Sequence, residues 1–416
     1  MSLKHAPPSS FKVILRVFLP FGCGYYLSYL YRTINAVISE NLTVELTLGP
    51  AGLGLLTSLY LIAFASSQIP LGVALDRYGP RKVNALLLMF AAAGAAVFSI
   101  AESFGLLMVG RALIGFGVSA ALMSALKANA LWFPSDRIPL MNNLIGAFGA
   151  LGAVSATRPV EVMLHTTEWR DIFGGLAVVT VIVSLMVLIL VPEKREMSQR
   201  SESFGMQLKG YGRVIRDIFF WRITLIFSFS YTAFVSYQTL WADPWLRDVA
   251  GLDQTERANY LLAIQLGFLV GLLLTGALAD LLRRTRFQAV HVFGTCILIF
   301  VGTQVLLALG TTSGLAALWF LFGLLSSAIY LAYAVQTAHF PAEMTGRAIT
   351  AMNFFMFVLA FFCQWSIGGI IESFTPDPDG GYSLEAHSTA LGIIIVVQVL
   401  CYVNFILPGL RKKKNG

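Results

Sequence analysis

The stretch Gly72–Lys82, GVALDRYGPRK, recurs in reduced form as Gly276–Arg286, GALADLLRRTR. Each copy combines glycine, aspartate and arginine in a short polar turn between two long apolar stretches. A basic turn that repeats in this way indicates a duplicated membrane bundle, and internal repeats of that kind are typical of secondary transporters. The sequence therefore predicts two related bundles of membrane helices and favours solute transport.

The composition of the chain also predicts a membrane protein. Of the 416 residues, 57% are hydrophobic and 12% are charged, and the mean hydropathy is +0.74. Soluble domains carry about 25% charged residues, so this chain has too little polar surface to cover a soluble particle. Its apolar stretches are long and continuous, which favours helices over barrel strands that alternate over about 10 residues.

The predicted fold is an all-α membrane protein with twelve transmembrane helices in two pseudo-symmetric six-helix bundles. Residues 1–195 form the N-terminal bundle, 196–220 a cytoplasmic linker, and 221–416 the C-terminal bundle with a basic cytoplasmic tail. A helix needs about 20 residues to cross the hydrocarbon. The predicted spans are 12–39, 52–74, 82–101, 105–132, 138–163, 172–191, 221–247, 257–280, 288–309, 314–339, 346–372 and 388–408.

Lysine and arginine residues gather on one side of this threading. They occupy the repeated turns, the linker and the C-terminal tail, whereas the opposite loops hold mainly Arg170, Arg247 and Arg257. By the positive-inside rule, both termini are cytoplasmic. The net charge of +7 follows from this topology and from contact with the lipid bilayer, so no nucleic-acid partner is expected. We expect a monomer that crosses a cell membrane many times, of the bacterial inner-membrane type.

Residues that would carry enzymatic or cofactor chemistry are few and scattered. The four cysteines and five histidines show no metal-ligand, disulfide or triad spacing, and no nucleotide-binding P-loop occurs. The sequence therefore predicts neither an enzyme nor a bound cofactor or metal. Uphill transport would then have to draw on an ion gradient.

The turn after the second span resembles the signature of the major facilitator superfamily. In that pattern Gly72 permits close helix packing, Asp76 lies at a helix end, and the turn contains Arg77, Gly79, Arg81 and Lys82. Two positions depart from it: Ala74 stands where a bulkier apolar residue is usual, and Pro80 where a basic one is usual. The second copy retains Asp280 and Arg283 but lacks the turn glycine.

A second element, GRALIGFGVSA, resembles the RxxxGxG motif of the fourth helix in that superfamily through Arg111, Gly115 and Gly117. The inner ends of the fourth and tenth spans also agree, as WFPSDR and HFPAEMTGR. The resemblance covers nearly the whole chain and implies alternating access, in which two bundles rock about a midplane cavity. It implies a gating and scaffold role for six residues: Asp76, Arg77, Arg81, Arg111, Asp280 and Arg283.

Substrate chemistry is predicted from charges inside the spans, because each costs at least about 2.5 kcal/mol at the bilayer centre. Three deep basic residues lie in the N-terminal half: Arg32, Lys127 and Arg158. Arg32 shares one helical face with Tyr25, Tyr29 and Asn35. An anionic substrate would relieve the repulsion between such cations. The alternatives are a structural pair for Arg32, headgroup contact for Lys127 and pairing with Glu161 for Arg158.

The C-terminal half supplies neutral and aromatic side chains at helical spacing, which suit a ligand with a ring or apolar body and a charged end. These are Gln238, Trp241, Tyr330, Tyr333 and Asn353. The alternative interpretation is helix packing. Candidates for proton coupling are Asp243, Glu161, Glu372 and His339, and ordinary positions at span ends are the alternative for them.

The segment YLYRTINAVIS is similar to the first helix of the anion:cation symporter branch of the superfamily. This similarity implies a substrate with a carboxylate or phosphate, which arginine binds through two parallel hydrogen bonds. We therefore predict a secondary active transporter that imports a small organic anion with protons, with anion exchange as the nearest alternative for coupling. An exporter of drugs or siderophore-like metabolites is an alternative within transport. A non-transporting membrane receptor is the alternative from another class.

Overall fold

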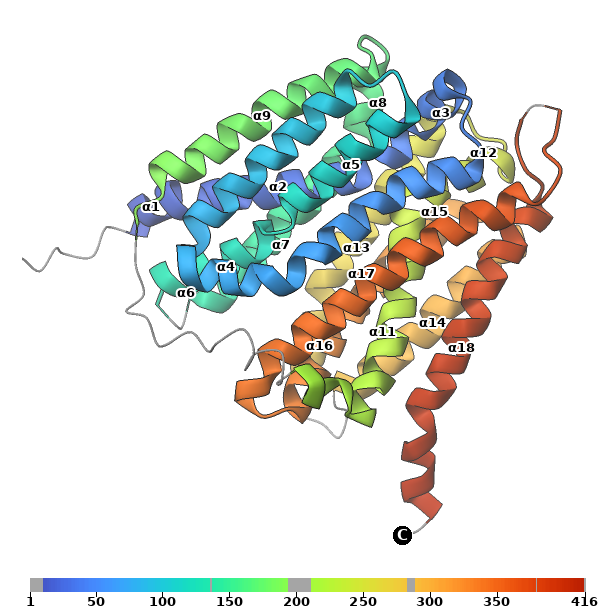
Figure 1. The fold of residues 1–416 in the computed structure, drawn as a ribbon. Helices are drawn as coiled ribbons and strands as arrows, with labels where there is room; N and C mark the ends of the chain where they lie inside the picture. Colours follow the sequence, from blue (N-terminus) through green and yellow to red (C-terminus); the bar gives the residue numbers. More distant parts are fainter. Residues whose placement is uncertain (1–9, 135–136, 194–210, 283–288, 379, 415–416) are drawn as a thin grey trace, which may run out of the picture.

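The described parts of the chain are nearly all helical. The computed structural model describes residues 10–134, 137–193, 211–282, 289–378 and 380–414, and these residues contain helices and turns without a strand. The helices of the first half lie side by side in one group, and those of the second half lie in another (Figure 1). The predicted all-α architecture is confirmed.

The first half of the chain packs mainly around α4, which contacts α5 and α9, while α2 contacts α7. Its elements are α1 (Ser10–Val13), the π-helix η1 (Ile14–Phe18), α2 (Leu19–Thr33), α3 (Asn35–Leu46), α4 (Pro50–Ser99), α5 (Phe104–Val118), α6 (Ala121–Trp132), α7 (Ile138–Ser155), α8 (Arg158–Leu164) and α9 (Trp169–Leu190).

In the second half, α13 packs on α15, α11 on α17, and α14 on α18. The elements are α11 (Ile218–Ser236), the π-helix η2 (Tyr237–Trp241), α12 (Ala242–Asp248), α13 (Gln254–Leu282), α14 (Ala289–Ala308), α15 (Leu315–Ser326), the 3₁₀ turn η3 (Ser327–Tyr330), α16 (Leu331–His339), α17 (Ala342–Glu372) and α18 (Leu384–Lys414). Of the predicted linker, residues 196–210 lie outside the described part of the chain.

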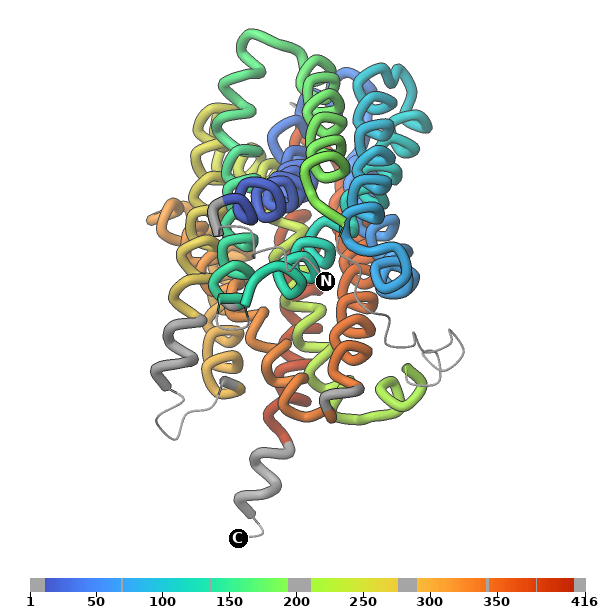
Figure 2. Tube along the Cα trace, turned by 90° about the vertical axis from the view of Figure 1, so that its left-hand side faces the viewer, coloured from blue at the N-terminus to red at the C-terminus, as the bar shows by residue number. Residues whose placement is uncertain are grey.

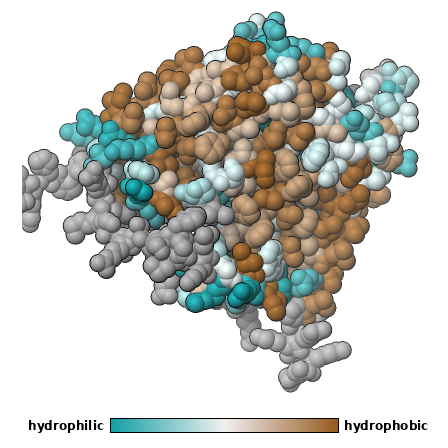
Figure 3. All heavy atoms as spheres, viewed as in Figure 1, coloured by the Kyte–Doolittle hydropathy of each residue, from teal (hydrophilic) through white to brown (hydrophobic). Residues whose placement is uncertain are grey.

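Eleven helices in the described residues are long and apolar enough to cross a membrane. The first predicted span is the one outside this group: its helix is interrupted at Ile34, between α2 and α3, and it has Ser28, Arg32 and Asn35 in its middle. Large apolar side chains such as Ile189 and Leu273 are exposed. Hydrophobic residues form a broad region across the face in Figure 3, as expected for contact with lipid.

The quoted turn divides α4 into two membrane spans. Gly79 has φ of 77° and interrupts the helix there, a backbone conformation that favours glycine. Pro80 follows at the start of the next span, where its missing N–H is tolerated. In the second copy, α13 ends at Leu282, the side chain of Asp280 is not described, and Arg283 lies outside the described residues.

The two groups of helices meet along α4 and α17, along α7 and α13, and where α3 contacts η2. Figure 2 shows α4 and α17 running next to one another. We use "N-terminal bundle" for α1–α9 and "C-terminal bundle" for α11–α18. The end of the molecule that carries the turn Asp76–Lys82 is called the basic end, and the end that carries Glu40, Glu161 and Arg257 the acidic end.

Candidate functional site between the bundles

Arg32 lies in the last turn of α2 and is 6% exposed. Four aromatic rings surround its guanidinium group. The Cζ atom lies 4.7 Å from the ring centre of Tyr29, 5.4 Å from Phe64, 5.6 Å from Phe357 and 5.8 Å from Tyr60. Phe357 belongs to the C-terminal bundle and the other rings to the N-terminal bundle, so the charge lies where the bundles meet. Aromatic faces attract a cation but do not neutralise it.

The guanidinium of Arg32 is only partly satisfied. Its Nη1 donates to the hydroxyl of Tyr231 in the C-terminal bundle at 3.2 Å. Its Nε is buried without a hydrogen-bond partner, and within the described residues Arg32 forms no ion pair with a carboxylate. A buried charge is costly unless it is paired. The site therefore has an open requirement for a negatively charged partner.

Tyrosine side chains continue from Arg32 into both bundles. The rings of Tyr25 and Tyr29 lie 5.2 Å apart, and the Tyr29 hydroxyl lies 3.4 Å from that of Tyr330. The ring of Tyr330 lies 6.0 Å from that of Tyr333, whose hydroxyl donates to Oδ1 of Asn353. Six side chains predicted for substrate binding are thus brought together: Arg32, Tyr25, Tyr29, Tyr330, Tyr333 and Asn353.

The backbone next to Arg32 is held by a second buried arginine. The last intrahelical bond of α2 runs from Ile34 N–H to the carbonyl of Leu30, so the following carbonyls lie past the end of its ladder. Arg111 donates from Nη1 to the carbonyl of Tyr31 at 2.7 Å and from Nη2 to that of Arg32 at 3.5 Å. The sequence assigned Arg111 to gating, whereas the structure places it directly behind the candidate site.

The structure does not bring the other two deep cations to Arg32. Lys127 in α6 is paired with Asp76 of the quoted turn, with Nζ and Oδ1 2.6 Å apart, at the basic end. Arg158, the first residue of α8, forms an ion pair with Glu161 at the acidic end. In both cases a carboxylate neutralises the lysine or arginine. The alternative that the sequence left open for Arg158 is the arrangement found.

Three further predicted residues are buried but bind other protein groups. The Asn35 amide donates to Thr57 Oγ1 at 3.2 Å, and the Gln238 amide donates to Gln265 at 2.7 Å. The Trp241 indole N–H donates to the carbonyl of Gln364 at 3.1 Å. Their polar groups therefore contribute to helix packing within each bundle.

At the basic end, the signature residues make contacts within the N-terminal bundle. Besides the pair of Asp76 with Lys127, Arg81 donates from Nε to the carbonyl of Leu188 at 2.8 Å, and the Arg77 guanidinium lies 5.3 Å from the ring centre of Tyr78. Arg81 thus ties the turn to the end of α9. This arrangement is compatible with a scaffold role.

Charged side chains join the bundles at the acidic end. Arg257 of α13 forms ion pairs with Asp243, at 2.8 Å from Nε to Oδ1, and with Glu40 of α3. Ser39 in the N-terminal bundle donates to the other oxygen of Asp243 at 3.0 Å. We call this group, Ser39, Glu40, Asp243 and Arg257, the acidic-end clasp. The sequence placed Arg257 in a loop. Its burial could have been predicted from its position as the first residue of an apolar stretch.

Two other proton-coupling candidates also join the bundles near the clasp. Glu161 accepts a hydrogen bond from Thr255 at 2.7 Å, and Glu372 accepts one from the backbone N–H of Ala51 at 2.7 Å. The fourth candidate, His339, lies 3.2 Å from Asp217 within the C-terminal bundle and stacks on Phe219. Three of the four candidates therefore lie at the interface between bundles.

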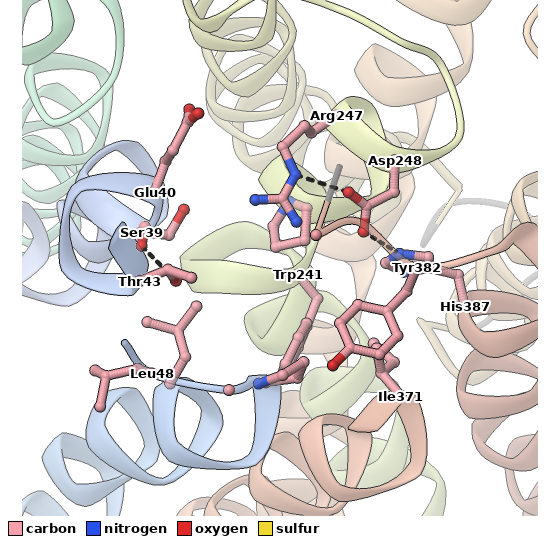
Figure 4. A pocket seen from close by; sticks show the side chains of 15 residues that line it. Ser39, Glu40, Thr43, Leu48, Trp241, Arg247, Asp248, Ile371, Tyr382 and His387 are labelled. Carbon is pink, nitrogen blue, oxygen red and sulfur yellow. Dashed lines mark hydrogen bonds and ion pairs between the residues drawn. The ribbon is translucent and has the colours of Figure 1, made fainter. Parts of the chain in front are cut away.

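A small pocket of about 100 Å³ opens beside the clasp, with walls from both bundles (Figure 4). On the wall contributed by the C-terminal bundle, Arg247 donates from Nε to Oδ1 of Asp248 at 2.7 Å. Nε2 of the buried His387 lies 2.9 Å from Oδ2 of Asp248. Glu40 and Trp241 also line it. Within the described residues, no group of three or more metal-ligating side chains converges, here or elsewhere.

Comparison with known proteins identifies the family. The model of the Major Facilitator Superfamily matches residues 21–363, and the chain belongs to that superfamily, as its turn and glycine motif predicted. The fold resembles the crystal structure of a bacterial homologue of the human lysosomal transporter Spinster in an inward-facing and unoccupied conformation. That likeness covers 96% of this chain and 97% of the other, with a TM-score of 0.76 and 17% identity. A D-xylose–proton symporter gives a TM-score of 0.70 at 14% identity over 93% and 97% of the two chains.

Sequence relatives are transporters. The chain is 25% identical to the probable sulfoacetate transporter SauU of Cupriavidus necator over 62% of each protein, so it matches less than two thirds of that relative. It is 24% identical to the hexuronate transporter of Bacillus subtilis over 93% of each, and 22% identical to the probable L-galactonate transporter of Escherichia coli over 89% of this chain and 83% of the other. Membership of the superfamily therefore places the chain in a class of membrane transporters rather than of enzymes.

Proposed function

We propose that this transporter moves a small organic anion by alternating access and that Arg32 binds the anionic group between the bundles. The observation that carries the proposal is the buried guanidinium of Arg32, which lacks a carboxylate partner among the described residues and has an unpaired Nε. The named substrates of three relatives, sulfoacetate, a hexuronate and L-galactonate, are all carboxylates. An anion at Arg32 would supply the missing negative charge.

The side chains around Arg32 suit the remainder of such a ligand. The hydroxyl groups of Tyr29 and Tyr330 lie 3.4 Å apart, and together with that of Tyr25 they have the chemistry to bind hydroxyl or carboxylate oxygens, while the rings offer apolar faces. Tyr231 contacts Arg32 from the opposite bundle. Because both bundles contribute, binding of the anion would respond to their relative movement.

We propose proton-coupled import with Asp243 as the proton carrier. Asp243 is 4% exposed, and its oxygens accept hydrogen bonds from Arg257 and from Ser39 of the other bundle. Protonation would weaken both interactions, so proton uptake and release would be linked to separation of the bundles at the acidic end. The positive-inside rule places that end outside the cell.

Transport by purified protein in proteoliposomes tests the role of Arg32. We expect wild-type protein to exchange labelled glucuronate, galactonate or sulfoacetate in counterflow, and Arg32→Gln to lose at least about 90% of that rate because the buried charge that binds the anion is gone. Arg213→Gln removes an exposed cation and serves as the matched control. Undiminished counterflow by Arg32→Gln contradicts the proposal.

A further inference from the structure

Two buried arginines face one tyrosine ring at the back of the site. The ring centre of Tyr60 lies 5.8 Å from Cζ of Arg32 and 5.0 Å from Cζ of Arg111. The separation of the two charges is therefore at most the sum of those distances. Tyr60 is itself fixed, because its hydroxyl donates to the carbonyl of Ser28 at 3.0 Å. The two arginines therefore share one aromatic neighbour whose position is fixed by a hydrogen bond.

Like Arg32, Arg111 lacks a neutralising carboxylate among the described residues. Its side chain is fully buried, its Nη atoms contact the carbonyls of Tyr31 and Arg32, and its Nε has no partner. In the described residues no carboxylate pairs with it. Carbonyl dipoles stabilise the guanidinium locally, but they leave its net charge in place. Two positive charges that no carboxylate of the described residues neutralises therefore lie next to the ring of Tyr60.

We infer that the site prefers doubly charged anions over singly charged ones and that Arg111 is a specificity-determining residue. The inference rests on the proposed binding of an anion at Arg32. Arg111 does not touch the ligand; it adds a second positive charge behind that of Arg32. For two charges about 10 Å apart in an effective dielectric constant of about 20, Coulomb's law gives roughly tenfold tighter binding for each added negative charge. The expected ligand class is a small dicarboxylate or sulfocarboxylate dianion.

Matched ligand pairs test this preference in purified protein. D-glucarate differs from D-gluconate, and sulfoacetate from isethionate, by a carboxylate in place of a hydroxymethyl group. We expect wild type to bind the dianion of at least one pair about tenfold or more tightly than its monoanion, as measured by equilibrium binding at pH 7.5 and fixed ionic strength. Arg111→Gln should lower that ratio about tenfold, whereas Arg111→Lys, which retains the charge, should keep it within about threefold.

The ratio separates charge from structural damage. A purely structural role of Arg111 would weaken both members of a pair alike and leave the ratio unchanged, and that result overturns the inference. Equal affinity of wild type for both members also overturns it, even if Arg111→Gln fails to fold. Binding of monoanions that depends on Arg32, together with equal affinity for dianions, rejects the inference and leaves the proposed function in place. If wild type binds none of the four anions, both are rejected.

Discussion

At the scale of the residue, the structure keeps a charge in the membrane interior that forms no ion pair with any of the residues described. Arg32 is held by four rings and one tyrosine hydroxyl. Cation–π contacts contribute up to about 2 kcal/mol each when they are desolvated, so the arrangement is tolerable without an anion. An anion next to the guanidinium would stabilise the buried charge further, and this gain would be the source of the proposed affinity.

Asp243 differs from Arg32 because its charge is already paired with that of Arg257. We expect Asp243→Asn to abolish accumulation of substrate driven by a pH gradient in proteoliposomes, because the side chain no longer carries a proton. Counterflow exchange, which needs no net proton movement, should continue at a rate within about fivefold of wild type. Accumulation that still follows the pH gradient in Asp243→Asn assigns the coupling to another residue.

Sequence reasoning could place Arg32, Tyr25 and Tyr29 together because they share one face of a single helix. It could not predict that Lys127 has a carboxylate partner whereas Arg32 has none in the described residues, because the partner of Lys127, Asp76, comes from a different helix. Contacts across helices depend on tertiary packing, which helical periodicity does not encode.

At the scale of the element, interruptions of helices lie close to the site. The hydrogen-bond ladder of the first span is interrupted at Ile34, whose dihedral angles stay in the α-helical region, η2 is a π-helix within the seventh span, and η3 is a 3₁₀ turn that ends at Tyr330. Such local departures are frequent at functional positions in helices. The break at Ile34 frees carbonyls that Arg111 then binds. Backbone irregularity and site geometry are therefore linked.

Close contact between α4 and α5 depends on small residues. A Cβ atom added at Gly117 would lie 2.2 Å from the backbone nitrogen of Ala91. Gly117→Ala should therefore force the helices apart and lower the free energy of unfolding by about 1–3 kcal/mol. Gly175→Ala in α9 meets no atom within 4 Å and should leave it unchanged or raise it by up to about 1 kcal/mol. Equal melting temperatures for Gly117→Ala and wild type in detergent contradict this packing argument.

The spans and the quoted turn were predictable because hydropathy and a glycine with positive φ are local properties. The turn at Gly79 falls where the sequence placed it. The break at Ile34 was not predicted: neither Thr33, Ile34 nor Asn35 is a glycine or proline. Its stabilising contact comes from Arg111, which is distant in the sequence, so the segment 12–39 indicated a continuous helix.

At the scale of the whole molecule, composition predicted the membrane fold, whereas the contacts between bundles became visible only in the structure. In the described part of the chain, the hydrogen bonds and ion pairs that join the bundles lie at the acidic end and around Arg32. The acidic-end clasp is the part of this interface where charges are paired. It is therefore expected to favour the state that is closed at this end.

Loss of the clasp should shift the molecule toward opening at the acidic end. Arg257→Gln removes both ion pairs, and we expect a longer and broader distance distribution between spin labels at Val44→Cys and Leu384→Cys in a background without native cysteines. Arg170→Gln is the matched control, because the ion pair of Arg170 with Glu45 stays within the N-terminal bundle. Identical distributions for Arg257→Gln and its parent exclude the clasp as a determinant of closure.

The central claim is that the uncompensated charge of Arg32 binds an anion between the bundles. Equilibrium binding to purified wild type, Arg32→Gln and Arg213→Gln, with glucuronate, galactonate, sulfoacetate and the neutral sugar glucose, tests it most directly. The account predicts saturable binding of at least one anion by wild type and Arg213→Gln, loss of that binding in folded Arg32→Gln, and no binding of glucose. Anion affinity that is equal in wild type and Arg32→Gln would contradict it.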